Sequence, residues 1–135
     1  MAAAAPAGMQ DSTPGRPHLP RRVPIDGYGK GGFRFAGMSH RGSILCLPQG
    51  IWAWPVTRPE EIDAANLARV FATGDVDLFL LGTGSAPWLM PEPLRWRFRD
   101  ARIGLEVTPT GAAVRTYNIL FGERRRVGAA LIAVE

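Results

Sequence analysis

EVTPTGAAVRTYNILFGERRRVGAALIAV, residues 106–134, is the stretch that decides the fold. Its pattern predicts a strand over 103–107, a helix that begins at Pro109 or Thr110 and runs to Phe121, and a final strand over 127–134. A helix that joins two strands with almost no linker is typical of a crossover between parallel strands. The stretch therefore favours an α/β fold.

The predicted helix has recognisable ends and an unusual middle. Thr108 suits the N-cap, Pro109 suits the first helical position, and Gly122 is a typical helix terminator. The middle carries more polar side chains than a purely structural helix needs: Thr110, Arg115, Thr116, Tyr117 and Asn118.

Working back along the chain, helices and strands alternate. Residues 91–102 predict a helix with Leu94 and Phe98 facing inward, and the apolar run 76–81 predicts a buried strand. Before them, residues 59–73 predict a helix with Thr57 as N-cap and Glu60 closing a capping box. Gly74 stops that helix, and its buried stripe comprises Ala64, Leu67, Ala68 and Phe71, with Val70 at the margin.

The pattern becomes β-like from Ile25. The segments around 33–35, 44–47 and 51–54 predict an antiparallel meander, and Ser39–Gly42 predicts a turn within it. The expected fold is α/β: a mixed β-sheet with an N-terminal antiparallel meander followed by α-β-α-β-α-β, with helices packed on the sheet. We expect residues 1–22, rich in Ala, Pro and Gly, to form a disordered tail, and residues 23–135 to form a single domain.

Composition excludes several classes of protein. The 135 residues contain no apolar run long enough to span a membrane, so no membrane span is expected. A single cysteine, Cys46, excludes an internal disulfide and a multi-cysteine metal site, and it is expected in a strand of the core. His18 is expected in the tail and His40 in the turn, without a metal-ligand spacing. We expect no metal and no cofactor.

Positive charge is concentrated in the last third of the chain. The formal net charge is +4, and residues 95–126 hold eight arginines against three carboxylates. Such a segment is either a solvated helix face or a surface that attracts an anionic partner. Specific nucleic-acid binding ranks last among the hypotheses, because no recognised motif accompanies the charge.

The best candidate site joins the end of the 76–81 strand to the polar helix. Gly82, Thr83 and Gly84 form either a ligand loop or a tight turn. Tyr117 and Asn118 either reach that loop or satisfy buried backbone groups. The candidate binding residues are Gly82, Thr83, Gly84, Thr110, Arg115, Tyr117, Asn118, Glu123 and Arg125, where Glu123 pairs with an arginine or both remain ordinary surface charges.

No catalytic constellation accompanies this site. A nucleophile elbow around Ser85 would need glycine where Thr83 and Pro87 stand, and a Walker A sequence is absent. Four tryptophans are available for the core or, where exposed, for a partner: Trp52, Trp54, Trp88 and Trp96.

These segments together resemble a known family. The residues from Ile25 to Phe33, the segment LFLLGTG (78–84) and the stretch 106–132 are similar to the family of the mitochondrial respiratory complex I assembly factor three, which includes the adipogenesis-associated Mth-like domain proteins and many bacterial members. The resemblance covers about 25–134. It implies the compact Mth-like α/β fold and no established catalytic activity, and the mitochondrial relative acts through protein partners.

Two hypotheses of function follow from the residues and the resemblance. The first is a non-catalytic protein-binding or assembly-factor-like domain, with respiratory-chain or membrane-complex assembly as the implied context. The alternative is a small-ligand-binding protein or enzyme with a pocket between the 82–84 loop and the 110–118 helix. The expected location is the cytoplasm of a bacterium, or the mitochondrion if the protein is eukaryotic. The sequence does not decide the oligomeric state.

Overall fold

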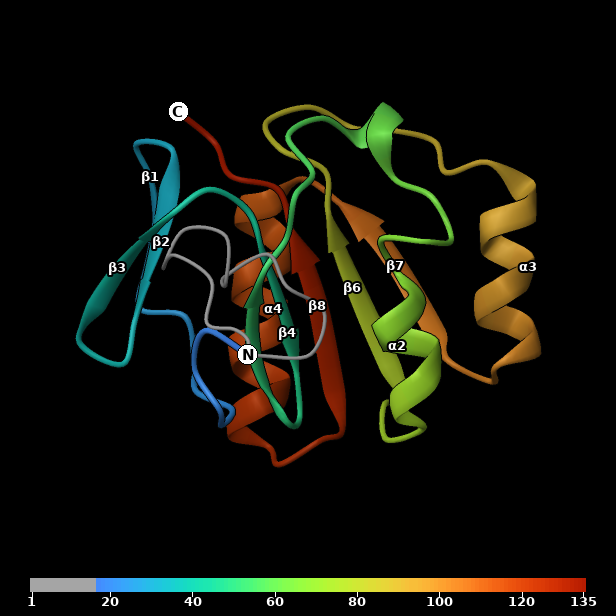
Figure 1. The fold of residues 1–135 in the computed structure, drawn as a ribbon, viewed down its shortest axis with the longest axis horizontal. Coiled ribbons are helices and arrows are strands. Elements are labelled where there is room, and N and C mark those ends of the chain that lie inside the picture. The colour runs from blue at the N-terminus through green and yellow to red at the C-terminus, as the bar shows by residue number, and fades with distance from the viewer. Residues whose placement is uncertain (1–16) are drawn as a thin grey trace, which may run out of the picture.

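Two β-sheets and their covering helices make up the computed structural model, which describes residues 17–135 (Figure 1). One sheet is antiparallel, with the strand order β1-β2-β3, and the other is mixed, with the order β5-β4-β8-β6-β7. The elements are β1 (Gly27–Gly29), β2 (Gly32–Phe35), β3 (Met38–Arg41), β4 (Ile44–Leu47), β5 (Gly50–Ala53), the 3-10 helix η1 (Pro59–Glu61), α2 (Ala68–Thr73), β6 (Leu78–Gly82), α3 (Glu92–Asp100), β7 (Gly104–Thr108), α4 (Thr110–Gly122) and β8 (Val127–Leu131). The expected α/β class with a mixed sheet is confirmed.

The last strand of the chain lies in the middle of the five-stranded sheet. β8 pairs parallel to β6 on one side and antiparallel to β4 on the other. Ala129, for example, pairs with Leu80 of β6 and with Cys46 of β4. The crossovers through α3 and α4 produce the parallel pairs, as the sequence predicted.

Alternation along the strands divides the core between the two faces of this sheet. One face packs against α4 and the three-stranded sheet, where Leu80, Ala129 and Ala113 are fully buried. The opposite face packs against α2 and α3, where Phe79 lies 5.4 Å from Phe98, ring centre to ring centre. Both faces are covered, which explains why the central strands are almost entirely apolar.

The predicted helix over 59–73 is wrong. Only the 3-10 helix η1 and the short helix α2 form there, because side chains between them bond to the backbone instead. Asp63 and Asn66 each accept a hydrogen bond from the other's backbone N–H, and Asn66 also donates to the carbonyl of Glu61. The expected capping box fails as well: the N–H of Thr57 donates to Glu61 Oε1 at 2.8 Å, so Glu61 rather than Glu60 reaches back.

The predicted turn at Ser39–Gly42 is also misplaced. Residues 39–41 belong to β3, and the turn lies earlier, at Ala36 and Gly37, whose φ angles are 51° and 75°. Gly42, with φ of 94°, marks the break where the chain leaves one sheet for the other. The expected meander is therefore split between two sheets, and His40 is a buried strand residue whose ring lies 4.8 Å from that of His18.

The packed part of the chain begins earlier than expected. Of the predicted tail, residues 1–16 lie outside the described residues. His18 and Leu19 both donate backbone hydrogen bonds to the carbonyl of Ile51, at the edge of β5, and Leu19 is buried. The segment 17–22 thus covers a sheet edge, a role that a Pro-rich composition does not reveal.

The remaining helices follow the sequence closely. Leu94 and Phe98 of α3 face inward as predicted, and α4 begins at Thr110, although Pro109 rather than Thr108 occupies its N-cap. Gly122 is the last residue of α4 rather than the residue that follows it. Cys46 is buried in β4. Among the helices of residues 17–135, none has the length and apolar character needed to cross a membrane.

Candidate functional site

The predicted 82–84 loop lies where expected, against the N-terminus of α4, but it is closed. The N–H of Gly84 donates to Thr110 Oγ1 at 2.9 Å, and that hydroxyl donates to the carbonyl of Ile132 at 2.7 Å. The N–H of Thr110 donates in turn to the carbonyl of Gly84 at 2.8 Å. Thr110 is fully buried and Thr83 almost so. These groups bond to one another rather than facing a ligand.

Tyr117 and Asn118 lie elsewhere on the helix. They are seven and eight residues beyond Thr110, which places them about 10 Å along the helix axis. Asn118 holds Ile25 at both ends: its Oδ1 accepts from the N–H of Ile25 at 2.9 Å, and its Nδ2 donates to the carbonyl of Ile25 at 2.8 Å. Tyr117 donates to the carbonyl of Val23 at 3.3 Å.

The polar middle of α4 therefore anchors the N-terminal segment. Burial raises the pKa of the Tyr117 phenol, so this group stays a neutral donor to Val23. The sequence left open whether Tyr117 and Asn118 reach the 82–84 loop or satisfy buried backbone groups. In the structure they satisfy backbone groups. The structure brings Gly82, Gly84 and Thr110 together, but Asn118 does not lie beside Thr110.

The remaining candidate residues are exposed. Within residues 17–135, Arg115, Glu123 and Arg125 form no ion pair with one another. The carbonyl of Arg125 accepts a hydrogen bond from Arg22, whose guanidinium lies 4.6 Å from the ring centre of Phe121. The charged contact in this region belongs instead to Arg126, which binds Asp77 at 2.8 Å.

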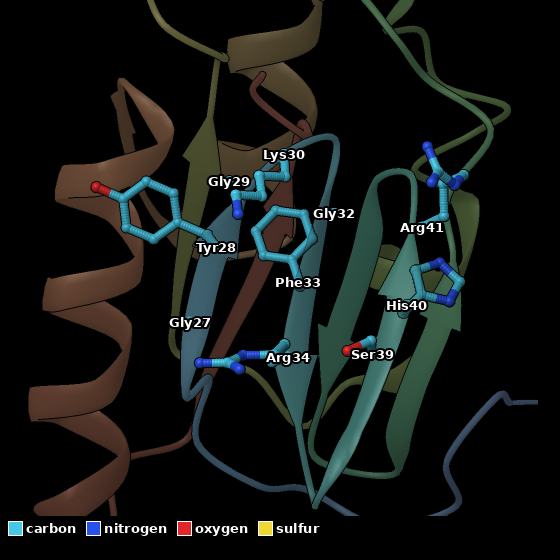
Figure 2. A pocket seen from close by; sticks show the side chains of 10 residues that line it. All are labelled: Gly27, Tyr28, Gly29, Lys30, Gly32, Phe33, Arg34, Ser39, His40 and Arg41. Atoms are coloured by element: carbon cyan, nitrogen blue, oxygen red, sulfur yellow. The ribbon is translucent and has the colours of Figure 1, made fainter.

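A hollow that the sequence did not indicate lies on the three-stranded sheet (Figure 2). Its volume is about 610 Å³. Strand register explains which side chains reach it. The pairing places Gly27, Arg34 and Ser39 in one row across the strands, and Gly29, Gly32 and Arg41 two rows further along. Alternate rows face the same side of a sheet, so these six residues share a face. The hollow is lined by Gly27, Tyr28, Gly29, Lys30, Gly32, Phe33, Arg34, Ser39, His40 and Arg41.

Glycines form the floor of this hollow and cations form its walls. Figure 2 shows Arg34 reaching from β2 toward Gly27 of β1, where a Cβ would lie 3.4 Å from its Nε. Gly32 has no room for a side chain, because a Cβ would clash with the backbone carbonyl of His40. The floor is therefore bare backbone, beneath two exposed guanidinium groups. The run of four glycines within 27–32 was the available signal in the sequence.

Comparison with known proteins places the chain in a family. The model of a family described as a protein of unknown function (DUF498/DUF598) matches residues 25–132. The chain belongs to the DUF498/DUF598 family. The match covers both sheets and the helices on them, which is the region where the sequence showed its resemblance.

Relatives of this DUF498/DUF598 protein include mitochondrial assembly factors. An uncharacterised protein of Rhodobacter capsulatus is 38% identical over 119 residues, which cover 88% of this chain and 91% of that protein. The mouse NADH dehydrogenase [ubiquinone] 1 alpha subcomplex assembly factor 3 is 30% identical over 115 residues, which cover 84% of this chain and 62% of the mouse protein. The expected relation to complex I assembly factor three is confirmed.

Solved structures share the fold of this DUF498/DUF598 protein. A crystal structure described as an outer membrane protein of Bartonella henselae has 48% identity and a TM-score of 0.84, and covers 87% of this chain and 100% of its own. An NMR structure of a Bordetella pertussis protein, described as a Mth938-like domain, has 27% identity and a TM-score of 0.73, and covers 82% of this chain and 85% of its own. The expected Mth-like fold is confirmed.

Proposed function

We propose that this protein is a non-catalytic protein-binding module that acts in the assembly of a larger complex. The relation to complex I assembly factors supports this class of function. The observation that carries it is an exposed apolar and cationic surface on residues 88–102. Leu89 is 81% exposed and Trp96 is 50% exposed, so this segment presents two large apolar side chains to solvent.

The residue types on this surface resemble those found at the centre of protein–protein interfaces. The guanidinium of Arg99 lies 4.5 Å from the ring centre of Trp96, and tryptophan and arginine are the residues that most often dominate binding energy between proteins. Within residues 88–102, three exposed arginines (Arg97, Arg99 and Arg102) stand against two exposed carboxylates (Glu92 and Asp100). A partner that presents an apolar pocket with an acidic rim would complement it.

The test compares variants of this surface with a matched change elsewhere. The wild-type protein, tagged and purified from its native cell, is expected to carry a stoichiometric protein partner, whose affinity is then measured with purified components. We expect the double variant Leu89→Ala and Trp96→Ala to weaken binding by about a hundredfold, since losing central anchors costs on the order of 2–4 kcal/mol.

The control is Ile119→Ala, which removes from α4 an apolar side chain whose exposure, 61%, lies between those of Leu89 and Trp96. It should leave the affinity within about twofold, as expected for a position outside the interface. Loss of binding on Ile119→Ala but not on the double variant would contradict the proposed surface. Recovery of a bound metabolite and no partner would favour the alternative, a small-ligand-binding protein.

The proposed location follows the same reasoning. A bacterial member of this family would act in the cytoplasm, and a eukaryotic member in the mitochondrion. The free, buried thiol of Cys46 is compatible with either reducing compartment.

A further inference from the structure

We infer that the hollow on the three-stranded sheet binds a phosphate group, with Arg34 and Arg41 as its cationic ligands. This site is separate from the surface on residues 88–102, and it does not depend on the proposed function. Its volume of about 610 Å³ lies in the range of small-molecule sites, about 300–1,000 Å³.

The charges in the hollow are all of one sign. Arg34 and Arg41 project from its two cross-strand rows, and Lys30 stands in the turn between β1 and β2. Within residues 17–135, none of these three side chains forms an ion pair with a carboxylate. Asp26 directly precedes β1, but it is not among the residues that line the hollow. The positive field of the hollow is therefore left uncompensated by the described part of the chain.

The geometry favours phosphate over a simple halide. Each guanidinium offers a planar fork of N–H donors that matches two oxygens of one phosphate. Ser39 pairs with Arg34 across the strands on the same face, so its hydroxyl adds a neutral donor beside the charges. At Gly29 no atom lies within 4 Å of the place where a Cβ would be, so a ligand can approach the backbone closely there. Two guanidinium groups and one hydroxyl above a surface of glycine backbone constitute a site for a tetrahedral oxyanion.

Two sources of phosphate fit this chemistry, the free ion and an organic phosphate ester. The volume of the hollow exceeds that of one phosphate ion, so the ester is the expected ligand. Titrations followed by NMR, with NaCl balancing the ionic strength, distinguish the two. The probes are inorganic phosphate, pyrophosphate and phenyl phosphate. Saturable shifts are expected at the amides of Gly27, Gly29 and Gly32, with tighter binding of phenyl phosphate than of inorganic phosphate. The reverse order would identify the free ion as the ligand of the same site.

Variants test whether the hollow is responsible. The double variant Arg34→Gln and Arg41→Gln should weaken phenyl phosphate binding at least about tenfold, because two charge-assisted contacts are lost. The control double variant Arg58→Gln and Arg102→Gln removes the same charge from exposed positions near η1 and α3, and should change the affinity less than about twofold, since screened distant charges contribute little.

A third variant tests the site without removing an arginine. Ser39→Glu places a carboxylate beside Arg34 and should abolish binding, while thermal unfolding shows that each variant remains folded. Absence of shifts with every phosphate probe would overturn the inference. So would equal weakening by the two double variants, which would show that the net charge of the protein, and not the hollow, attracts the anion.

Discussion

At the scale of single residues, one amide side chain does most to fix the N-terminal segment. Asn118 donates to and accepts from the backbone of Ile25, 93 positions earlier in the chain, as a neighbouring β-strand would. The segment leads directly into β1, so the position of the three-stranded sheet depends on this contact. Tyr117 adds a longer hydrogen bond to Val23.

We expect Asn118→Ala to lower the free energy of unfolding by about 1–3 kcal/mol, because both backbone groups of Ile25 lose their partner in a partly buried place. Tyr117→Phe removes one hydrogen bond and should cost less, about 0.5–1.5 kcal/mol. Urea unfolding of both variants measures the difference. A larger loss for Tyr117→Phe than for Asn118→Ala would show that Asn118 is not the main anchor.

The sequence predicted the residue types of the candidate site better than their partners. It identified Gly82, Gly84 and Thr110 as neighbours, because a strand end and the following crossover helix meet at one edge of a parallel sheet. It could not assign Asn118 to Ile25, because no local pattern encodes a contact 93 positions away. The hollow was missed for the same reason: it depends on the register of three strands, which places Arg34 and Arg41 on one face.

At the scale of elements, β6 and α4 approach each other more closely than side chains would allow. A Cβ at Gly82 would lie 3.0 Å from both the Cα of Thr110 and the Cδ2 of Leu131. The glycine thus lets the helix N-terminus sit directly on the strand end, where the hydroxyl of Thr110 ties the two together.

Gly82→Ala should therefore lower the free energy of unfolding by about 1–3 kcal/mol, since the backbone at Thr110 cannot move aside cheaply. Gly122→Ala is the matched control. A Cβ there meets no atom within 4 Å, and the residue lies in α4, so the change should be neutral or stabilise by up to about 1 kcal/mol. Thermal unfolding of the two variants suffices. Equal effects at both positions would contradict the close approach.

Elements with strong apolar periodicity were predictable, and elements decided by side-chain-to-backbone bonds were not. Helices α3 and α4 and strand β6 follow their apolar patterns. The helix over 59–73 failed because Asp63 and Asn66 satisfy backbone groups locally, which competes with helical hydrogen bonding. The predicted position of the turn was wrong because Ala36 adopts a positive φ, a conformation that an alanine in the sequence does not indicate.

At the scale of the whole molecule, two ionisable groups are buried on the same side of the central sheet. Cys46 of β4 and Tyr117 of α4 both belong to the core between the five-stranded sheet and α4. Burial raises the pKa of each group in the folded protein, because the charged form cannot be solvated there.

Stability should consequently fall in alkaline solution. In the unfolded chain the thiol ionises at about pH 8.5 and the phenol at about pH 10, whereas in the folded protein both keep their protons. The free energy of unfolding should be independent of these groups below about pH 8, and above each unfolded pKa it should decrease by about 1.4 kcal/mol per pH unit for each group. Urea unfolding measures this slope. It should be followed from about pH 7 to about pH 11, a range that includes the unfolded pKa values of both groups.

Cys46→Ala provides the control, because it should remove the decrease that begins near pH 8.5 and leave the one that begins near pH 10. An unchanged slope in this variant would show that Cys46 does not titrate on unfolding.

The place of β8 in the middle of the sheet also decides when the protein can fold during synthesis. β4 and β6 are translated well before residues 127–131, and although they can pair with β5 and β7, neither can pair with β8 until those residues have left the ribosome. A nascent chain that stalls before residue 127 holds two half-sheets with open hydrogen-bonding edges, which are templates for aggregation. The five-stranded sheet can therefore close only after residues 127–131 have left the ribosome, because β8 is the strand that joins its two halves.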